Sequence, residues 1–410
     1  MTPKAEFLTR VERGDLCSGC GGCALASGGA IEMELSAPGF LRPVQRAAIP
    51  EETDRSIAAI CPGLGQTLDR RATHDDVLWG PYEEMRTGWA SAPDLRHAAS
   101  SGGALSAVLG WLIESGMVEA AVHVAADSDR PTANRVTVSR DAAEIKAAAG
   151  SRYAPSAPLA ALGPLIAQGG RYAFVGKPCD IVALRALARQ DARIDACFPV
   201  MLSFFCAGVP SLAGADAVLA ALGTAPDQVT GFRYRGNGWP GEATATLRDG
   251  TARSMSYHDS WGKILSGHVQ RRCKICPDGT GKEADLVCAD AWQSDARGYP
   301  LFTEQEGVSL VVARTPLGRD LMAGAEAAGA LTTGGFDVAT LDRMQPGQSG
   351  RRRAVLARLA GLRLAGRPIP RYRGLRLAEM ARSNTVKGNL RNMLGMFKRA
   401  MGTPGRRRKL

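Results

Sequence analysis

Residues 17–23 read Cys-Ser-Gly-Cys-Gly-Gly-Cys, and Cys61 follows in a Cys-Pro-Gly turn. Three closely spaced cysteines followed by a remote Cys-Pro are typical of a loop that wraps one [4Fe-4S] cluster. Glycines give such a loop backbone angles that other residues avoid, and its N–H groups then point at the sulfides. Zinc sites more often contain two separated Cys-x2-Cys pairs. The spacing therefore predicts a cluster, rather than zinc or free thiols, on Cys17, Cys20, Cys23 and Cys61.

A second group of cysteines is less sharply defined by its spacing. Cys273 and Cys276 form a Cys-x2-Cys pair in a turn-rich loop, a pattern shared by zinc sites, redox dithiols and half of a cluster site. Cys179 and Cys206 each follow an apolar run that predicts a buried strand, and ligands of open α/β sheets bind beyond the strand ends. The simplest partition places a second cluster on these four residues and leaves two buried, unreactive thiols.

Helix-like and strand-like segments alternate from residue 86 to 225, which favours a mixed sheet built from βαβ units. Residues 229–257 have β character, and Asp249-Gly250 marks the turn of a hairpin. The expected helices cover residues 104–115, 141–149 and 316–328, and further strands are expected at residues 118–125, 172–176, 198–205 and 307–313.

Polar loops in this region are candidates for binding a nucleotide or a flavin. Small residues before a helix present free N–H groups to an anion, although serine and glycine are also ordinary helix caps. The Gly-x-Gly-x-x-Gly fingerprint of an NAD-binding fold does not occur between a strand and a helix. The candidate cofactor-binding residues are Ser100, Ser101, Gly102, Gly103, Ser151, Arg152, Tyr153 and Lys177.

The motifs CSGCGGC, ASSGG, GSRY, VGKPCD, FFCAGVPS and RCKICPDGTGKEAD occur in this order over residues 15–345. Together they resemble the coenzyme F-420 hydrogenase/dehydrogenase beta subunit family, which includes 7-hydroxymethyl chlorophyll a reductase and ferredoxin-dependent divinyl chlorophyllide 8-vinyl reductase. The resemblance implies a flavoprotein oxidoreductase with FAD near the SSGG and GSRY loops. It also implies one or two [4Fe-4S] clusters and supports the second set of four cysteines. Its expected partners are a ferredoxin-like or hydrogenase protein and a small ring substrate.

The expected fold class is mixed α/β (α+β), with a ferredoxin-like N-terminal cluster region followed by a mixed-sheet flavin-binding core. Four regions are expected: a ferredoxin-like iron-sulfur region (1–85), an α/β flavin-binding core (86–225), a β-rich part with the second cluster motif (226–345), and a basic helical or flexible tail (346–410). His97 and His258 are candidate catalytic proton donors because they flank the predicted flavin loop and an aromatic stretch.

Charge divides the chain unevenly. Residues 351–410 hold 18 Lys and Arg against the single acid Glu379, a net charge of +17, whereas residues 1–350 carry −6. The sequence has no secretory leader and no long apolar run, so we expect a cytoplasmic protein. An amphipathic basic stretch at residues 389–401 suggests docking on an anionic membrane surface, at the inner face, with a solvated tail as the simpler alternative. A different function class, a zinc-stabilised module that binds nucleic acid, lacks the necessary aromatic residues and a recognised fold.

Overall fold

The computed structural model describes residues 3–292, 301 and 303–402, and its centre is a mixed sheet of eight strands. The strands lie in the order β16-β6-β15-β14-β10-β9-β7-β8, and the four strands from β14 to β7 are parallel. Their bounds are Leu331–Gly334, Glu84–Ala90, Ser309–Ala313, Leu286–Asp290, Val200–Phe204, Tyr172–Val175, Ala120–Ala126 and Asn134–Ser139. The mixed fold class expected from the sequence is confirmed.

Side chains alternate between the two faces of this sheet, because successive residues of a strand point in opposite directions. In β9, Tyr172 and Phe174 pack on one face, whereas Ala173 and Val175 pack on the other. Helices α8 (Pro178–Ala188) and α9 (Ala192–Cys197) cover the first face, and helices α5 (Ala104–Glu114), α6 (Ala142–Ala147) and α12 (Pro316–Ala327) cover the second. The buried strands therefore contain near-continuous apolar runs, as the sequence predicted.

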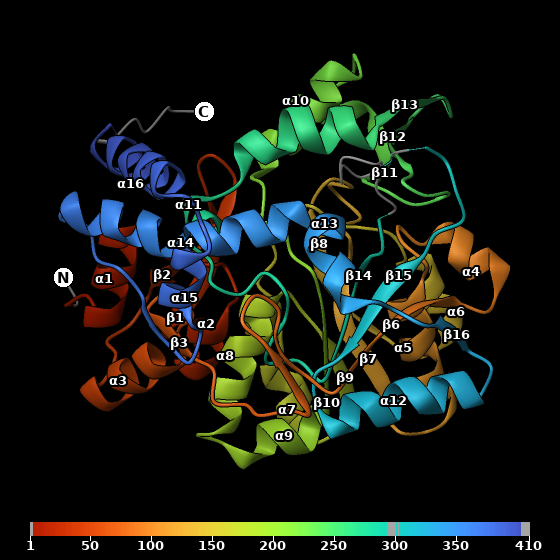
Figure 1. Ribbon diagram of the computed structural model, residues 1–410, viewed down its shortest axis with the longest axis horizontal. Coiled ribbons are helices and arrows are strands. Elements are labelled where there is room, and N and C mark those ends of the chain that lie inside the picture. The colour runs from red at the N-terminus through yellow and green to blue at the C-terminus, as the bar shows by residue number, and fades with distance from the viewer. Residues whose placement is uncertain (1–2, 293–300, 302, 403–410) are drawn as a thin grey trace.

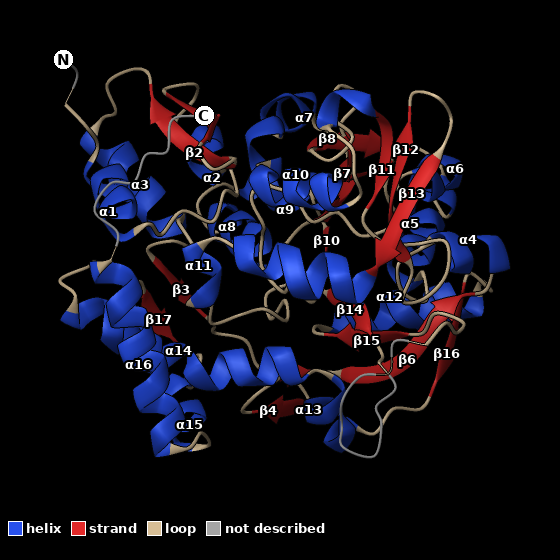
Figure 2. Ribbon diagram, turned by 90° about the horizontal axis from the view of Figure 1, so that it is seen from above, coloured by secondary structure: helices blue, strands red, loops and turns tan. Residues whose placement is uncertain are grey.

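The predicted hairpin forms part of a second, smaller sheet. Strands β11 (Val229–Arg233), β12 (Glu242–Leu247) and β13 (Ala252–Ser256) are antiparallel, and α10 (Leu212–Ala221) packs on them through its own apolar cluster. Figure 2 shows this sheet beside α10 and away from strands β14–β16. A π-helical turn, η3 (His258–Ile264), and the short helix η4 (Leu265–His268) lead from it to α11 (Arg271–Lys274).

The N-terminal region and the C-terminal helices form one structural unit (Figure 1). Leu8 and Val11 from the first region share a hydrophobic cluster with Val355, Leu359 and Met396 from the last. The basic segment is therefore folded against the body of the protein. The elements involved are α1 (Glu6–Gly14), α2 (Gly22–Ala26), β1 (Ile31–Ser36), β2 (Phe40–Gln45), α3 (Glu51–Ile60), α14 (Pro346–Leu364), α15 (Leu377–Arg382) and α16 (Val386–Met401), with β3 (Gly65–Thr67) paired to β17 (Arg371–Arg373).

Some arginines of the basic C-terminal segment form hydrogen bonds inside the protein. Arg352 is buried, and its guanidinium donates to the carbonyl oxygens of Pro277 and Leu375, both at 2.6 Å. Arg351 donates to the carbonyl oxygen of Cys206 at 3.1 Å. Part of the +17 charge thus serves as internal hydrogen-bond donors, which charge counting alone does not reveal. No helix in the described ranges has both the length and the apolar character needed to cross a membrane.

Candidate redox site

The structure brings the first four cysteines close enough to act on one another electrostatically. Residues 17–21 form a loop between α1 and α2, and Cys61 ends α3. Gly21 has a positive φ of 86°, and a Cβ there would lie 2.7 Å from the backbone nitrogen of Ala160. The backbone N–H of Gly19 donates to Cys17 Sγ at 3.3 Å. The glycines thus allow both the sharp turn and the close approach that a cluster loop requires.

Burial and mutual repulsion both raise the pKa values of these thiols. The pKa of Cys20 is raised to about 12, mainly by burial and also by the nearby Cys61, Asp180 and Cys17. The pKa of Cys61 is raised to about 11, again by burial and by Cys17. The pKa of Cys23 is raised well above the usual thiol value by burial and by the other three sulfurs. Four thiolates at this place would need compensating positive charge, which iron would supply if a cluster were bound.

The second group of four cysteines also converges, at the C-terminal ends of β9 and β10. Cys179 lies in the first turn of α8, directly after β9, and Cys206 follows β10. The pKa of Cys206 is raised to about 12, mainly by burial and also by Cys273 and Cys276. Burial also raises the pKa of Cys179 well above its usual value, and Cys206 and Cys276 contribute.

Backbone contacts hold the loops of this second group in place. The N–H of Val209 donates to Cys273 Sγ at 3.4 Å, and Cys276 Sγ donates to the carbonyl oxygen of Asp278 at 3.2 Å. The two remaining cysteines, Cys197 at the end of α9 and Cys288 in β14, are buried. No other cysteine of the described chain contributes to the pKa of either one, so both lie outside the two groups.

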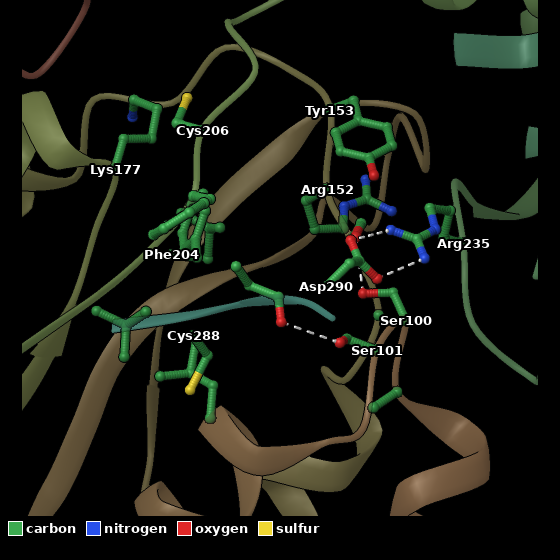
Figure 3. Close-up of a pocket in the computed structure, with 18 of the residues that line it drawn as sticks. Ser100, Ser101, Arg152, Tyr153, Lys177, Phe204, Cys206, Arg235, Cys288 and Asp290 are labelled. Carbon is green, nitrogen blue, oxygen red and sulfur yellow. Dashed lines mark hydrogen bonds and ion pairs between the residues drawn. The ribbon is translucent and has the colours of Figure 1, made fainter. Parts of the chain in front are cut away.

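A cavity of about 300 Å³ adjoins the second cysteine group. Cys206 and Lys177 line one end, and Ser100 and Ser101 line the other (Figure 3). The Ser151 hydroxyl donates to Ser100 Oγ at 2.7 Å, so the structure brings two of the loops singled out in the sequence into direct contact. Such a volume is in the range of sites that hold small ligands and cofactors.

Some of the candidate cofactor-binding residues line the cavity, and others form contacts inside the protein. Ser100 and Gly103 line the cavity at the N-terminus of α5. Gly102 is not part of the described lining, and its N–H donates to Ser309 Oγ at 3.0 Å. Lys177 is buried, and its Nζ donates to Ser156 Oγ at 2.9 Å and to an oxygen of Asp180 at 2.7 Å.

Arg152 lines the cavity but uses its donors within the protein. Nε donates to Asn134 Oδ1 at 3.0 Å, Nη1 to the carbonyl oxygen of Phe232 at 2.9 Å, and Nη2 to those of Pro131 and Ala133 at 2.7 and 2.6 Å. This geometry fixes the loop that carries Ser151 and Tyr153. A direct contact from Arg152 to a phosphate, as the sequence suggested, would compete with these bonds.

The two histidines predicted to be proton donors do not line the cavity formed by the described residues. His97 on α4 (Pro93–Ala98) and His258 at the start of η3 are both exposed, and the described lining of the cavity includes neither side chain. Their role as proton donors stays a prediction without support from the cavity.

An ion pair that sequence reasoning did not identify lies at the wall of the cavity. Arg235 is 2% exposed and forms two hydrogen bonds of 2.9 Å with Asp290, whose Oδ1 also accepts from the Trp239 indole at 2.8 Å. The Arg235 guanidinium lies 4.5 Å from the Tyr257 ring centroid and 5.2 Å from that of Trp292. Burial alone would lower the pKa of Arg235, but Asp290 outweighs that effect and the net pKa is raised. The feature of the sequence that could have identified Asp290 is its position at the end of an apolar run that forms a central strand.

Replacing Asp290 with asparagine is expected to lower the free energy of unfolding by about 3–5 kcal/mol, because it leaves Arg235 buried without its counter-charge. Urea denaturation measures this change. The control is Glu51→Gln, which removes the same charge from an exposed ion pair with Arg55 and should change stability by less than about 0.5 kcal/mol. Equal effects of the two substitutions would contradict the structural role of Asp290.

Comparisons with known proteins identify the family of the chain. Residues 85–163 match the model of the coenzyme F420 hydrogenase/dehydrogenase beta subunit N-terminal part, and residues 169–338 match that of the C-terminal part. No curated protein matches the chain. A chain of the F420-reducing NiFe hydrogenase complex from Methanosarcina barkeri, solved as a xenon derivative, is 18% identical, with a TM-score of 0.51 over 69% of this chain and 96% of that chain. That likeness is one of fold. Because the two family regions occur in order and together span more than half of the sequence, this protein belongs to the coenzyme F420 hydrogenase/dehydrogenase beta subunit family of electron-transferring oxidoreductases.

Proposed function

We propose that the protein is an iron-sulfur flavoprotein that relays electrons between a one-electron partner and FAD, and from there to a small ring substrate such as a deazaflavin or a tetrapyrrole. The observation that carries the proposal is the cavity that joins the candidate flavin loops to the second cysteine group. Single electrons arriving through clusters would then reach the flavin over a short distance.

We infer cubane clusters rather than zinc ions from the triplet spacing and the glycine-rich loop of residues 17–23. A [4Fe-4S] cluster binds each of its thiolates through a different iron, so the sulfurs are farther apart than ligands that surround one zinc ion at about 2.3 Å. Among the described residues, no group of three or more His, Cys, Asp or Glu side chains is arranged to hold a metal ion. The convergence of the thiols and the glycine loop at residues 17–23 support the cluster proposal.

The opposite end of the cavity fits the phosphates of FAD. Helix α5 has 11 residues and begins at Ala104, so its N-terminal dipole is directed toward an anion beside Ser100 and Gly103. Bound FAD would supply the exchange between single electrons and electron pairs. Ser100 and Ser151 would orient the phosphates, and Arg152 would act by holding the Ser151 loop in place.

Aromatic side chains at the cavity wall favour a planar substrate. Tyr153 packs against Trp261 with ring centroids 4.8 Å apart, and Tyr257 stacks on Trp292 at 5.8 Å. Rings of this kind bind flat ligands by stacking. The flavin ring and substrate would lie between these rings and Cys206, with the phosphates farther along at Ser100.

The proposal predicts that reduced ferredoxin reduces the flavin of the holoprotein under anaerobic conditions. Mixing the two proteins and following the bleaching of the flavin absorbance measures this transfer, and a screen of ring compounds for reoxidation then identifies the substrate class. A hydrogenase-type protein is the alternative donor, since the structural neighbour belongs to a hydrogenase complex. A colourless chain that holds zinc and accepts no electrons would instead support the zinc-stabilised binding module.

We also propose that α16 rests on an anionic membrane surface. Val386, Leu390, Leu394 and Met401 are 86%, 50%, 45% and 58% exposed. They lie on one side of the helix, beside Lys387, Arg391 and Lys398, while Met396 and Ala400 face the protein. Exposed apolar residues flanked by cations are characteristic of helices that lie in the membrane interface.

Replacing Val386, Leu390 and Leu394 together with serine should weaken binding to vesicles that contain anionic lipid at least tenfold, because these side chains supply the apolar contact. Liposome flotation of the full chain measures the effect. Leu35→Ser is the control, because Leu35 is 53% exposed on β1 and should leave binding unchanged. Equal flotation of the triple variant and the control would contradict the proposed membrane-binding surface on α16.

The division of the chain into four regions at residues 85, 225 and 345 also remains a proposal.

A further inference from the structure

A short segment, residues 270–273, joins the two cysteine groups. Gln270 is buried, and its side-chain amide donates to the carbonyl oxygen of Ser18 at 3.2 Å and to Cys273 Sγ at 3.4 Å. Ser18 lies within the first cysteine loop, and Cys273 belongs to the second group. One side chain thus contacts the immediate surroundings of both predicted clusters.

Arg272, in the same segment, forms the second connection. It is 3% exposed, and its Nη2 donates to the carbonyl oxygen of Pro62 at 2.6 Å, directly after Cys61 of the first group. Its neighbour in sequence is Cys273 of the second group. The guanidinium lies 5.9 Å from the centroid of the Tyr372 ring, and the Tyr372 hydroxyl donates to the carbonyl oxygen of Ile275 at 3.2 Å. The side chain is therefore held in place from two sides.

The surroundings of Arg272 include cysteines of the second group. The groups that act on it most strongly are Tyr372 and the three cysteines Cys276, Cys179 and Cys273, with no carboxylate among them. It acts in turn on Cys17 and Cys61 of the first group. Its Nε has no hydrogen-bond partner in the described part of the chain. Negative charge nearby stabilises a buried cation, and clusters bound by the two cysteine groups would supply it.

We propose that Arg272 is a shared positive charge that sets the reduction potentials of both clusters, and that Gln270 tunes the second cluster through its bond to Cys273; this inference rests on the proposed function. A guanidinium stays charged at all physiological pH values, and in a buried site its field is weakly screened. It stabilises the more negative, reduced form of each cluster, so it raises both potentials together. Its field would therefore shift both potentials in the same direction.

The test is a redox titration of the full, anaerobically assembled chain, with both cluster signals followed by electron paramagnetic resonance. Arg272→Gln should make reduction of each cluster at least tenfold less favourable, which is about 59 mV for a one-electron couple. Gln270→Met, which removes no charge, should shift the second cluster alone. Arg233→Gln is the control: Arg233 is a half-buried arginine that donates to the carbonyl oxygens of Ala98 and Ala149, and its loss should leave both potentials unchanged.

The outcomes separate this inference from the proposed function. Two clusters whose potentials both fall in Arg272→Gln support it, and two clusters with one or no shifted potential overturn it. A wild-type chain that assembles fewer than two clusters contradicts the proposed function itself. If Arg272→Gln does not assemble, Arg272→Lys provides the test. An ammonium that cannot reach Pro62 should lower both potentials by a smaller amount. Unchanged potentials in Arg272→Lys would overturn the inference.

Discussion

Replacing Cys20 with alanine is expected to lower the iron content of the anaerobically assembled chain from about eight to about four atoms, because one complete [4Fe-4S] cluster loses its binding site. Cys20 is buried in the main hydrophobic core, and its sulfur is close enough to Cys61 and Cys17 for their charges to raise its pKa. Cys179→Ala should remove the other four atoms. Iron and sulfide analysis measures both changes.

Cys197→Ala is the matched control for these two variants. Cys197 is also a buried thiol, but it ends α9 and belongs to neither group, so its loss should leave about eight irons in place. Equal iron loss in all three variants would indicate general unfolding. Full iron in Cys179→Ala would restrict the protein to a single cluster and remove the second from the relay.

Replacing Ser100 with aspartate is expected to weaken FAD binding about 100-fold, because a carboxylate would face the flavin phosphates at close range in the cavity. Ser100 lies just before α5 and contacts Ser151, so both candidate phosphate loops would be affected. An acidic residue near a helix N-terminus does not destabilise the helix, which separates flavin loss from unfolding. Flavin fluorescence titration of the apoprotein measures the dissociation constant.

Ser100→Asn is the control for this charge effect, since asparagine has nearly the same shape as aspartate and is neutral. We expect it to weaken FAD binding less than tenfold. Equal affinities in the aspartate and asparagine variants would place the phosphates away from α5 and would contradict this part of the proposal.

Much of the fold followed from local patterns in the sequence. The apolar runs at residues 172–176 and 198–205 became the central parallel strands β9 and β10, and the Asp249-Gly250 turn joined β12 to β13. The predicted helix at residues 104–115 was confirmed to within one residue. These segments combine strong periodicity with distinct turn residues, so local chemistry and the final fold agree.

The rest depended on contacts between distant segments. No local signal shows that Arg152 donates to four oxygens of other segments, or that Arg235 pairs with Asp290. The high positive charge of the C-terminal segment suggested an exposed tail and gave no indication that it packs on the body of the protein. Its residues Val355, Leu359 and Leu362 nevertheless have the i, i+4, i+7 spacing of a buried helix face. Long-range partners of this kind are set by tertiary packing, which a single sequence does not encode in readable form.

The central claim is that two clusters and one flavin occupy this chain, and their stoichiometry tests it most directly. The full chain should be assembled anaerobically, and its iron, sulfide, zinc and flavin contents measured on the same sample. We expect about eight irons, about eight sulfides and one FAD per chain, with no zinc. A preparation that contains zinc in place of iron and has no flavin absorbance would contradict the account.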